Sequence, residues 1–334
     1  MVRVTVLGSG SKGNCTVVTT SHTRIAIDAG FSCREIVKRM RLREEVPEKL
    51  DAILITHEHQ DHVQGLSVLA RRWDTPVYAT QATYAAWKRW ITPRSTMSFS
   101  AWLEQRRQEA ANGSLEGNRT PEEIPAMAAA ATTGVEELSE AIPPVHEALR
   151  NSEEELFTAD SRSDDPAWLP CVEHFRAGIP FEIGDISITP FTIPHDAADP
   201  VGFVLQAEGV RIAIATDLGY IPPNVRMHLE RADLLMIESN HDLEMLRDGP
   251  YPWVVKQRVL SRVGHLSNNA VSDYLSEDYD GGARFVVLAH ISESNNLPEL
   301  VLHSAERALN GRMRLLGNKL MLASQNMPLE SIYL

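Results

Sequence analysis

Cysteine is scarce in this chain, whose 334 residues include three, Cys15, Cys33 and Cys171. Their spacing fits neither a zinc ligand set nor a disulfide framework, and low cysteine usage is typical of a reducing cytoplasm. No apolar run approaches the ~20 residues of a membrane span. Residues 2–7 lead directly into a loop rich in Gly and Ser, which argues against a signal peptide. The sequence therefore predicts a cytoplasmic protein with no membrane partner.

Positive charge is also in short supply, because 45 Asp and Glu outnumber 32 Lys and Arg and give a net charge of −13. The deficit is concentrated in residues 101–170, which hold 15 acidic residues, five Arg and no Lys. That segment has a net charge of −10, so −3 remains for the rest of the chain. A nearly neutral body with an acidic insertion does not exclude nucleic acid as a partner, as a uniformly acidic protein would tend to do.

The patterns of regular secondary structure stop in the middle of the chain. Residues 112–125 are rich in Gly, Asn, Pro and Glu, and residues 126–133 are mostly Ala and Thr. High net charge and few aromatic residues are typical of flexible or loosely helical segments. We therefore predict one domain over residues 1–334 with an acidic, partly flexible or helical insertion at residues 99–171. Trp102 and Trp168, near the ends of the insertion, are candidates for docking it on the body.

The most informative stretch follows a short apolar run, residues 52–56, which is expected to form a buried strand. Four potential metal ligands come within the next six residues: His57, His59, Asp61 and His62. Side chains alternate with period two in an extended chain, so His57 and His59 would share one ion. Asp61 and His62 lie where the chain turns into a predicted helix at 63–72, and they would face a second ion. A solvated loop that is His-rich by chance is the alternative, but four ligand types directly after a buried strand disfavour it.

The first loop, residues 8–14, reads GSGSKGN. Its glycines let the backbone approach a ligand closely, and Ser9, Ser11 and Asn14 offer donors suited to phosphate oxygens. The loop lacks the spacing of a P-loop, so a triphosphate site of that type is not expected, and a plain hairpin turn is the alternative. Asp28, which ends a later strand, is expected to hold a metal-binding His through a hydrogen bond.

A basic helix is predicted over residues 32–43, because Ser32 and Glu35 form a capping box. Its cationic side chains could contact a phosphate backbone, but a solvated helix face is the favoured interpretation. These side chains are Arg34, Lys38, Arg39, Arg41 and Arg43.

Helices and strands alternate along the chain, which is typical of an α/β fold with strands beneath helices. Further buried strands are predicted at residues 201–207, 210–215, 234–238 and 285–289. Polar side chains of ligand type stand at the carboxyl ends of four apolar runs: His57, His195, Asp217 and His290. A common rim at strand ends is where such a site would be built.

The H-x-H-x-D-H pattern after a hydrophobic strand resembles the signature of the metallo-β-lactamase fold. Further motifs follow in the same order as in the YycJ/WalJ-type exonuclease family, over roughly residues 1–98 and 172–334. The resemblance implies an α/β fold built as a four-layer αββα sandwich. The motifs are GSGSKGN at 8–14, IDAG at 27–30, PHDA at 194–197, DPVGF at 199–203, TDLG at 216–219, ESNHD at 238–242, GHLSN at 264–268 and LAHIS at 288–292.

The resemblance also implies ligands for two divalent ions, Zn²⁺ or Mn²⁺. Two such ions ~3.5–4 Å apart can hold a hydroxide at neutral pH and stabilise both oxygens of a phosphodiester displacement. Asp61 is thereby expected to serve catalysis as well as metal binding. The implied ligands are His57, His59 and His195 for one ion, Asp61, His62 and His290 for the other, and Asp217 as a bridge.

A leaving oxygen needs a proton, and the resemblance points to His265 as the general acid. A packing residue at a helix start is the alternative for His265. Ser292 and Asn295 could bind phosphate, or they could cap a helix predicted at 297–309. His241 is expected to lie behind the ligands or to position substrate rather than to bind metal directly.

The favoured function is a metal-dependent hydrolase, specifically a 5′-to-3′ exonuclease that acts on DNA. The alternative is a small-molecule hydrolase of the same fold, acting on a thioester, a lactone or a cyclic phosphodiester. A non-enzymatic module is disfavoured, because structural zinc sites are usually closed by four ligands. Steep salt dependence of binding would indicate the nuclease, since a polymer substrate presents many phosphates.

Overall fold

The structure is a computed structural model that describes residues 1–92, 165–309 and 318–334. The chain forms two units, one of residues 1–92 and 166–334 and one of residues 93–165. Most of the predicted insertion, residues 99–164, lies outside the described residues, as do the helices expected within it. All the helices and strands named below belong to the first unit.

The first sheet has seven strands and combines the N-terminal part of the chain with its last residues. Val, Ile and Thr make up most of its first three strands, and these residues pack well on a pleated surface. Pairing is antiparallel from β14 through β1 and β2 to β3, and parallel from β3 to β6. In sheet order the strands are β14 (Ile332–Tyr333), β1 (Arg3–Gly8), β2 (Cys15–Thr19), β3 (Arg24–Ile27), β4 (Ala52–Leu54), β5 (Val77–Thr80) and β6 (Val172–Phe175).

The second sheet repeats this plan with strands from the later part of the chain. It also has seven strands, antiparallel from β7 to β10 and parallel from β10 to β13. In sheet order the strands are β13 (Lys319–Leu322), β12 (Phe285–Ala289), β11 (Leu234–Glu238), β10 (Val210–Ala215), β9 (Val201–Ala207), β8 (Ile186–Thr192) and β7 (Phe181–Ile183).

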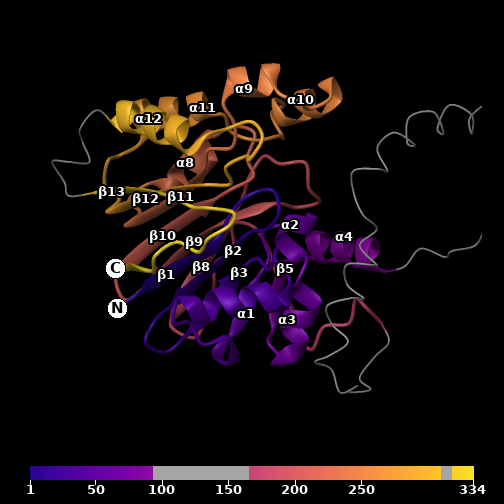
Figure 1. Cartoon of the computed structure of the whole chain (residues 1–334). Helices are drawn as coiled ribbons and strands as arrows, with labels where there is room; N and C mark the ends of the chain where they lie inside the picture. Colours follow the sequence, from indigo (N-terminus) through magenta and orange to yellow (C-terminus); the bar gives the residue numbers. More distant parts are fainter. Residues whose placement is uncertain (93–164, 310–317) are drawn as a thin grey trace, which may run out of the picture. The chain divides into compact units, whose positions relative to one another are not determined.

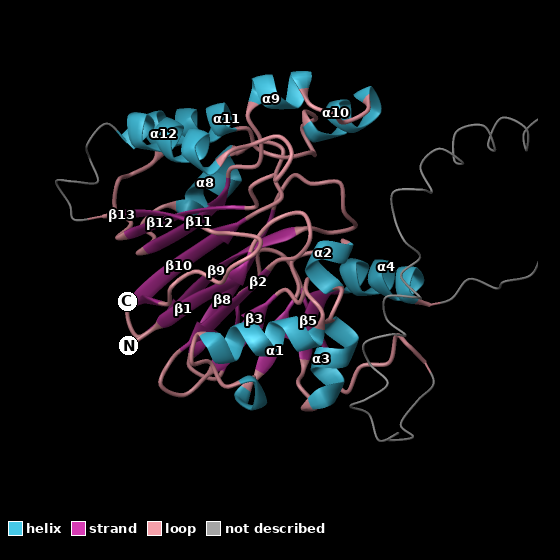
Figure 2. Cartoon of the chain, in the orientation of Figure 1, coloured by secondary structure: helices cyan, strands magenta, loops and turns pink. Residues whose placement is uncertain are grey.

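The two sheets pack face to face, and each outer face is covered by helices (Figures 1 and 2). This arrangement is the four-layer αββα sandwich that the resemblance implied. On the first sheet the helices are α1 (Cys33–Leu42), a 3₁₀ turn (Pro47–Lys49), α2 (Gln60–Val63), α3 (Leu66–Arg72) and α4 (Gln81–Ile91). On the second sheet the helices are α8 (Pro223–Leu229), α9 (Leu243–Asp248), α10 (Trp253–Val259), α11 (Asn268–Asp273), a π-helical turn (Tyr274–Asp278) and α12 (Pro298–Leu309).

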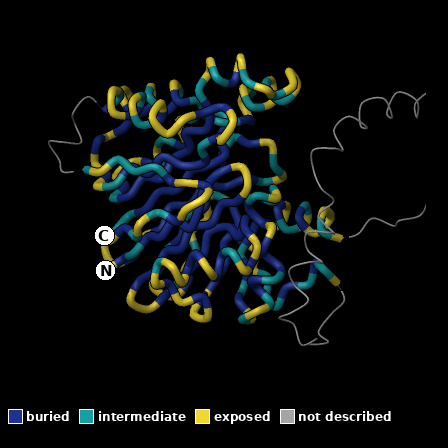
Figure 3. Tube along the Cα trace, in the orientation of Figure 1, coloured by how far each residue is buried: buried dark blue, intermediate teal, exposed yellow. Residues whose placement is uncertain are grey.

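Both faces of each sheet are buried, and the strands divide their side chains between two cores. In β4, Leu54 faces the core between the sheets and Ile53 faces the core beneath the helices. Met236 and Leu235 of β11 divide in the same way on the other sheet. Figure 3 shows the strands as buried and the exposed positions on helices and loops.

The prediction of one helix over residues 63–72 is wrong in one respect, because the chain forms two short helices there. Gly65 separates α2 from α3, and its N–H donates to Ala29 O at 2.8 Å instead of continuing a helix. A Cβ at this position would lie 2.1 Å from Phe31 O, so only glycine fits. The break turns the chain directly after the His-rich loop.

The end of the predicted insertion, residues 166–171, is described and belongs to the first unit. Arg71 donates to Trp168 O at 2.9 Å, and its guanidinium lies 5.8 Å from the Trp168 ring centroid. Ala167 and Leu169 are buried beneath α3 and α4 in the helix-side core.

Among the described residues, no helix has both the length and the apolar character needed to cross a membrane.

Candidate metal centre

Four strand ends deliver the predicted ligands to one rim. His57 follows β4 in the first sheet, whereas His195, Asp217 and His290 follow β8, β10 and β12 in the second. The site therefore draws on both halves of the sandwich. The sequence analysis expected this convergence, and the structure brings the side chains together in two clusters.

His57, His59 and His195 form the first cluster. Nδ1 of His59 lies 3.1 Å from His57 Nε2 and 3.2 Å from His195 Nε2. One nitrogen from each ring thus meets at a common point, which is the arrangement of three ligands of one ion. His57 and His195 are buried and His59 is half-buried, so the cluster opens to solvent on the side of His59.

Hydrogen bonds behind these rings fix which nitrogen carries the proton. His195 Nδ1 lies 3.2 Å from Gly264 O, and a carbonyl oxygen only accepts, so Nδ1 is the protonated atom. Thr56 Oγ1 donates its proton to Asp28 and therefore accepts from His57 Nδ1 at 3.0 Å. In both rings Nε2 is left with a bare lone pair that points into the cluster.

Asp61, His62, Asp217 and His290 form the second cluster. His62 Nε2 lies 3.3 Å from Asp217 Oδ2 and 3.5 Å from Asp61 Oδ2. His290 Nε2 lies 3.4 Å from Asp61 Oδ2. Asp217 Oδ2 is buried and makes no hydrogen bond within the described part of the chain. A buried carboxylate oxygen in that situation is suited to a cation.

The rings of the second cluster are held from behind by carboxylates. His62 Nδ1 donates to Asp28 Oδ2 at 2.8 Å, the role that the sequence analysis expected of Asp28. His290 Nδ1 donates to Glu238 Oε1 at 2.8 Å. Metal-binding histidines typically donate their other N–H to such a partner. Four imidazoles that point Nε2 inward, together with Asp61 and Asp217, form a ligand set suited to a pair of divalent ions.

Charge within the clusters is strongly perturbed. Burial and the neighbouring His62 hold the pKa of His57 well below its ordinary value, so its lone pair is available at neutral pH. Burial opposes the charge of His62 as well, but Asp217, Asp28 and Asp61 outweigh burial and raise its pKa well above the ordinary value. The second cluster therefore attracts positive charge, whether a proton or a metal ion.

The backbone is strained at three of these positions. Asp28, Asp217 and His290 have φ angles of 62°, 61° and 52°, in the left-handed region that is costly for residues other than glycine. Each stands directly after or near the end of a buried strand. Such strain persists only where surrounding structure imposes it, and it gathers at functional sites.

His265 stands beside the second cluster and is oriented by Glu238. Its Nδ1 lies 2.7 Å from Glu238 Oε1, the oxygen that also accepts from His290. Burial alone would raise the pKa of Glu238, but the charge of His265 and the hydrogen bonds from both rings lower it to about 2. Glu238 belongs to the ESNHD motif, but its role was not predicted from the sequence. Its position as a carboxylate at the end of a buried strand could have indicated a functional residue.

The GSGSKGN loop is built into the centre from one side. Ser9 Oγ donates to Asn14 Oδ1 and accepts from His290 N, while Asn14 Nδ2 lies 3.1 Å from His62 Nε2. Both side chains are buried. Asn14 N also donates to Asp61 O at 2.8 Å, close to Gly30, where a Cβ would lie 1.7 Å from Asp61 O. Ser9 and Asn14 thus support the ligands, and their contact with substrate stays a prediction.

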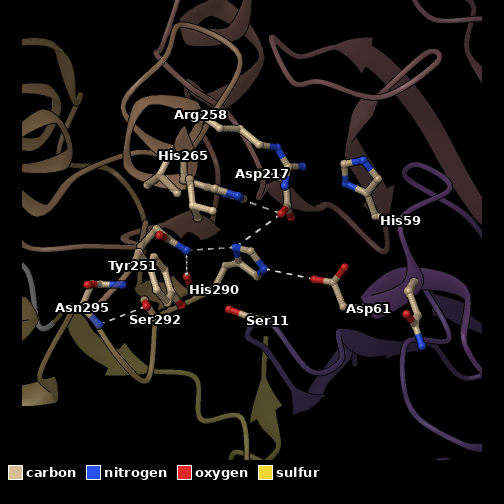
Figure 4. Close-up of a pocket in the computed structure, with 14 residues that line it drawn as sticks. Ser11, His59, Asp61, Asp217, Tyr251, Arg258, His265, His290, Ser292 and Asn295 are labelled. Atoms are coloured by element: carbon tan, nitrogen blue, oxygen red, sulfur yellow. Dashed lines mark hydrogen bonds and ion pairs between the residues drawn. The ribbon is translucent and has the colours of Figure 1, made fainter. Parts of the chain in front are cut away.

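A pocket of about 390 Å³ opens beside the clusters (Figure 4). Predicted residues in its wall include exposed Ser11 and buried Ser292 and Asn295. Both amide atoms of Asn295 are buried and have no partner within the described part of the chain. Sequence reasoning missed Tyr251 and Arg258, which also line the pocket, because no motif marked their segment.

His241 lies outside both clusters. Burial lowers its pKa to about 4, so its ring is neutral at pH 7. Neither ring nitrogen has a hydrogen-bond partner among the residues that the structure describes. Its expected role behind the ligands or toward substrate remains a prediction.

Two family models match the chain. The model described as the metallo-beta-lactamase superfamily matches residues 8–141, and the model described as a beta-lactamase superfamily domain matches residues 122–291. Both matches extend into residues 99–171, which the sequence analysis left outside the resemblance.

Two curated relatives align with most of the chain. Exodeoxyribonuclease YycJ of Bacillus anthracis is 29% identical over 304 residues, which cover 91% of this chain and 88% of that protein. Exodeoxyribonuclease WalJ of Streptococcus pneumoniae serotype 2 (strain D39 / NCTC 7466) is 29% identical over 298 residues, or 89% and 84% of the two chains. Among solved structures, the metallo-beta-lactamase fold protein YhfI from Bacillus subtilis superposes with a TM-score of 0.59 over 98% of each chain, at 14% identity.

Proposed function

This chain belongs to the metallo-β-lactamase superfamily and is a metal-dependent hydrolase of that fold. From this premise we propose that the protein is a DNA exonuclease, that it uses two divalent ions and that it digests DNA from the 5′ end. The observation that carries the proposal is the pair of neighbouring clusters, one of three histidines and one of two histidines and two aspartates, whose ligand atoms lie within reach of a common ion. The similarity to two proteins named exodeoxyribonucleases supports DNA as the substrate.

Bound divalent ions would supply positive charge for a scissile phosphate and lower the pKa of water from ~15.7 toward ~7. His57, His59 and His195 would hold one ion, and Asp61, His62 and His290 the other, with Asp217 between them. His265 is the proposed general acid for the leaving oxygen, because it lies at the pocket and its pKa is raised. Burial opposes that rise, and the carboxylate of Glu238 outweighs burial.

Substrate phosphate would be held by groups that face the pocket. Ser11, which is exposed, and Arg258 both line the pocket. Ser292 and Asn295 are also proposed as substrate contacts, since both line the pocket and the unpartnered amide of Asn295 has both a donor and an acceptor.

The test uses protein stripped with a chelator and reloaded with Zn²⁺ or Mn²⁺, on end-labelled single- and double-stranded DNA. We expect metal-dependent release of mononucleotides from the 5′ end. His59→Ala should lower the rate by more than about a hundredfold and reduce bound metal measured by elemental analysis. His22 is an exposed histidine outside both clusters, so His22→Ala serves as the matched control and should keep the cleavage rate and the metal content of the unsubstituted protein.

Intact DNA in the presence of metal-loaded protein would contradict the exonuclease proposal. Cleavage of a thioester, lactone or cyclic phosphodiester under the same conditions would then establish the small-molecule alternative. Release of mononucleotides from the 3′ end would support the nuclease activity but contradict the proposed direction of digestion.

A further inference from the structure

Helix α10 is apolar and exposed, which is unusual for a helix on a folded domain. Its sequence is WVVKQRV, and none of its residues is buried. The side chain of Trp253 is 65% exposed and that of Val254 is 75% exposed. A surface helix normally turns its apolar residues to the core, and a cluster of exposed apolar side chains usually marks an interaction site.

Several polar contacts hold α10 in place although it buries no side chain. Lys256 Nζ donates to Arg247 O at 2.7 Å and to Gly249 O at 2.8 Å, which ties α10 to the end of α9. Arg258 pairs with Asp196, and its Nη2 lies 3.1 Å from Asp196 Oδ1. His265 N donates to Val259 O at 2.9 Å. The apolar side chains are therefore presented by an anchored helix.

The same helix forms one wall of the catalytic pocket. Val255, Arg258 and Val259, spaced as one helix face, line the pocket together with Tyr251 (Figure 4). Trp253 and Val254 stand on the same short helix, next to that wall. A ligand that leaves the pocket along α10 would meet these two side chains.

The charge around α10 differs from that of the rest of the chain. Residues 249–272 contain Lys256, Arg258 and Arg262 and no Asp or Glu, although the whole chain has 45 acidic residues. Glu244 and Asp248 of α9 precede this stretch. Asp196 occupies Nε and Nη2 of Arg258, so other donors of the guanidinium remain available. Exposed aromatic and cationic side chains in one segment match single-stranded nucleic acid, whose bases stack and whose phosphates need cations.

We propose that the α10 surface, defined as Tyr251, Trp253, Val254, Arg258 and Leu260, binds the single-stranded DNA that extends from the pocket. The inference rests on the proposed function and adds the path of the substrate strand. A base stacks on Trp253 and Arg258 contacts a phosphate next to the pocket. A protein partner is a poorer fit, because the surface is continuous with the pocket and includes the guanidinium of Arg258 rather than apolar side chains alone.

The test measures binding of metal-loaded protein to a fluorescein-labelled phosphorothioate oligothymidylate, which resists cleavage. Trp253→Ala should raise the dissociation constant about tenfold, and Trp253→Phe should restore most of the affinity. Arg258→Gln should reduce the slope of log affinity against log salt by about one. Trp90→Ala, an exposed tryptophan on α4, is the matched control and should bind like the unsubstituted protein.

A second measurement needs no variant. Photo-crosslinking to an oligonucleotide that contains 5-bromodeoxyuridine should place an adduct on the peptide with Trp253. Unchanged affinity in Trp253→Ala, with no adduct on that peptide, would overturn the inference even if the protein degrades DNA. Failure of the unsubstituted protein to degrade DNA would instead overturn the proposed function.

Discussion

Glu238 serves two imidazoles that have different proposed duties. One of its oxygens accepts from His290, a proposed ligand, and from His265, the proposed general acid. The other accepts the backbone N–H groups of Leu218 and Leu266. A single carboxylate therefore holds the proposed ligand His290 and the proposed proton donor His265 next to each other.

Glu238→Gln should impair the general acid through its pKa. The carboxylate raises the pKa of His265 against the effect of burial, so the acid keeps its proton to a higher pH than an ordinary histidine and loses it as pH rises through that pKa. Without the charge, the decline of kcat/KM should begin at a lower pH, with a loss of about 10²-fold or more at neutral pH. A pH–rate profile checks this. Glu293→Gln, at an exposed pair with Lys12, is the control, and an unshifted profile in Glu238→Gln would contradict the assignment.

The sequence identified these residues unevenly. His57, His59, Asp61 and His62 were readable because they are adjacent in the chain and follow a buried strand. The partners of their rings are distant in sequence, as with Glu238 and His290, so spacing alone carries no information about them. Arg258 stands in a helix without amphipathic periodicity, which is why its place at the pocket was not predicted.

At the scale of elements, α1 contributes more than a basic surface. The structure buries Arg39, which departs from the favoured interpretation of a solvated face, whereas Arg34, Lys38 and Arg41 are exposed as expected. Its Nη1 donates to Leu7 O at 3.0 Å and to Gln325 O at 2.9 Å, and its guanidinium lies 4.1 Å from the Phe31 ring centroid. The expected cap is present, since Ser32 accepts from Glu35 N. Arg39 thus joins the helix to β1 and to the C-terminal segment.

Arg39→Met should destabilise the protein by about 2–3 kcal/mol, because two buried carbonyls lose charged donors. The midpoint of urea unfolding measures the loss. Arg41→Met offers a matched control on the same helix, since Arg41 makes an exposed pair with Glu48 that should be worth less than about 1 kcal/mol. Equal effects of the two substitutions would show that burial of Arg39 contributes little.

The strands were predicted more accurately than the helices and edges. Residues 201–207, 210–215, 234–238 and 285–289 form strands with the predicted bounds, because long apolar runs between turn residues leave few alternatives. The edge strands β6, β13 and β14 were not predicted. They are short, and their pairing depends on neighbours that the local sequence does not specify.

At the scale of the molecule, the metal centre joins the two sheets. His57, His59, Asp61 and His62 come from the first half, and His195, Asp217 and His290 come from the second. An ion held by ligands from both halves stabilises the folded state relative to an unfolded chain that cannot bring them together.

Chelation should therefore lower the melting temperature by several degrees, since each ion at a hundredfold excess over its dissociation constant adds about 2.7 kcal/mol. Differential scanning fluorimetry with and without EDTA measures the shift. The His59→Ala protein should show a smaller shift than His22→Ala. Identical shifts in the two variants would indicate that the stabilising ion binds elsewhere.

The pairing of the first strand with the last has a consequence for synthesis on the ribosome. The termini lie side by side (Figure 1), and β14 completes the sheet that begins with β1. Ser9 N donates to Ser324 O and Leu329 N donates to Val6 O, so the GSGSKGN loop and β1 are supported by residues that are translated long after them. A nascent chain that already contains every proposed ligand still lacks these supports. Activity would therefore be expected only after residues 324–334 have been synthesised and have paired with β1.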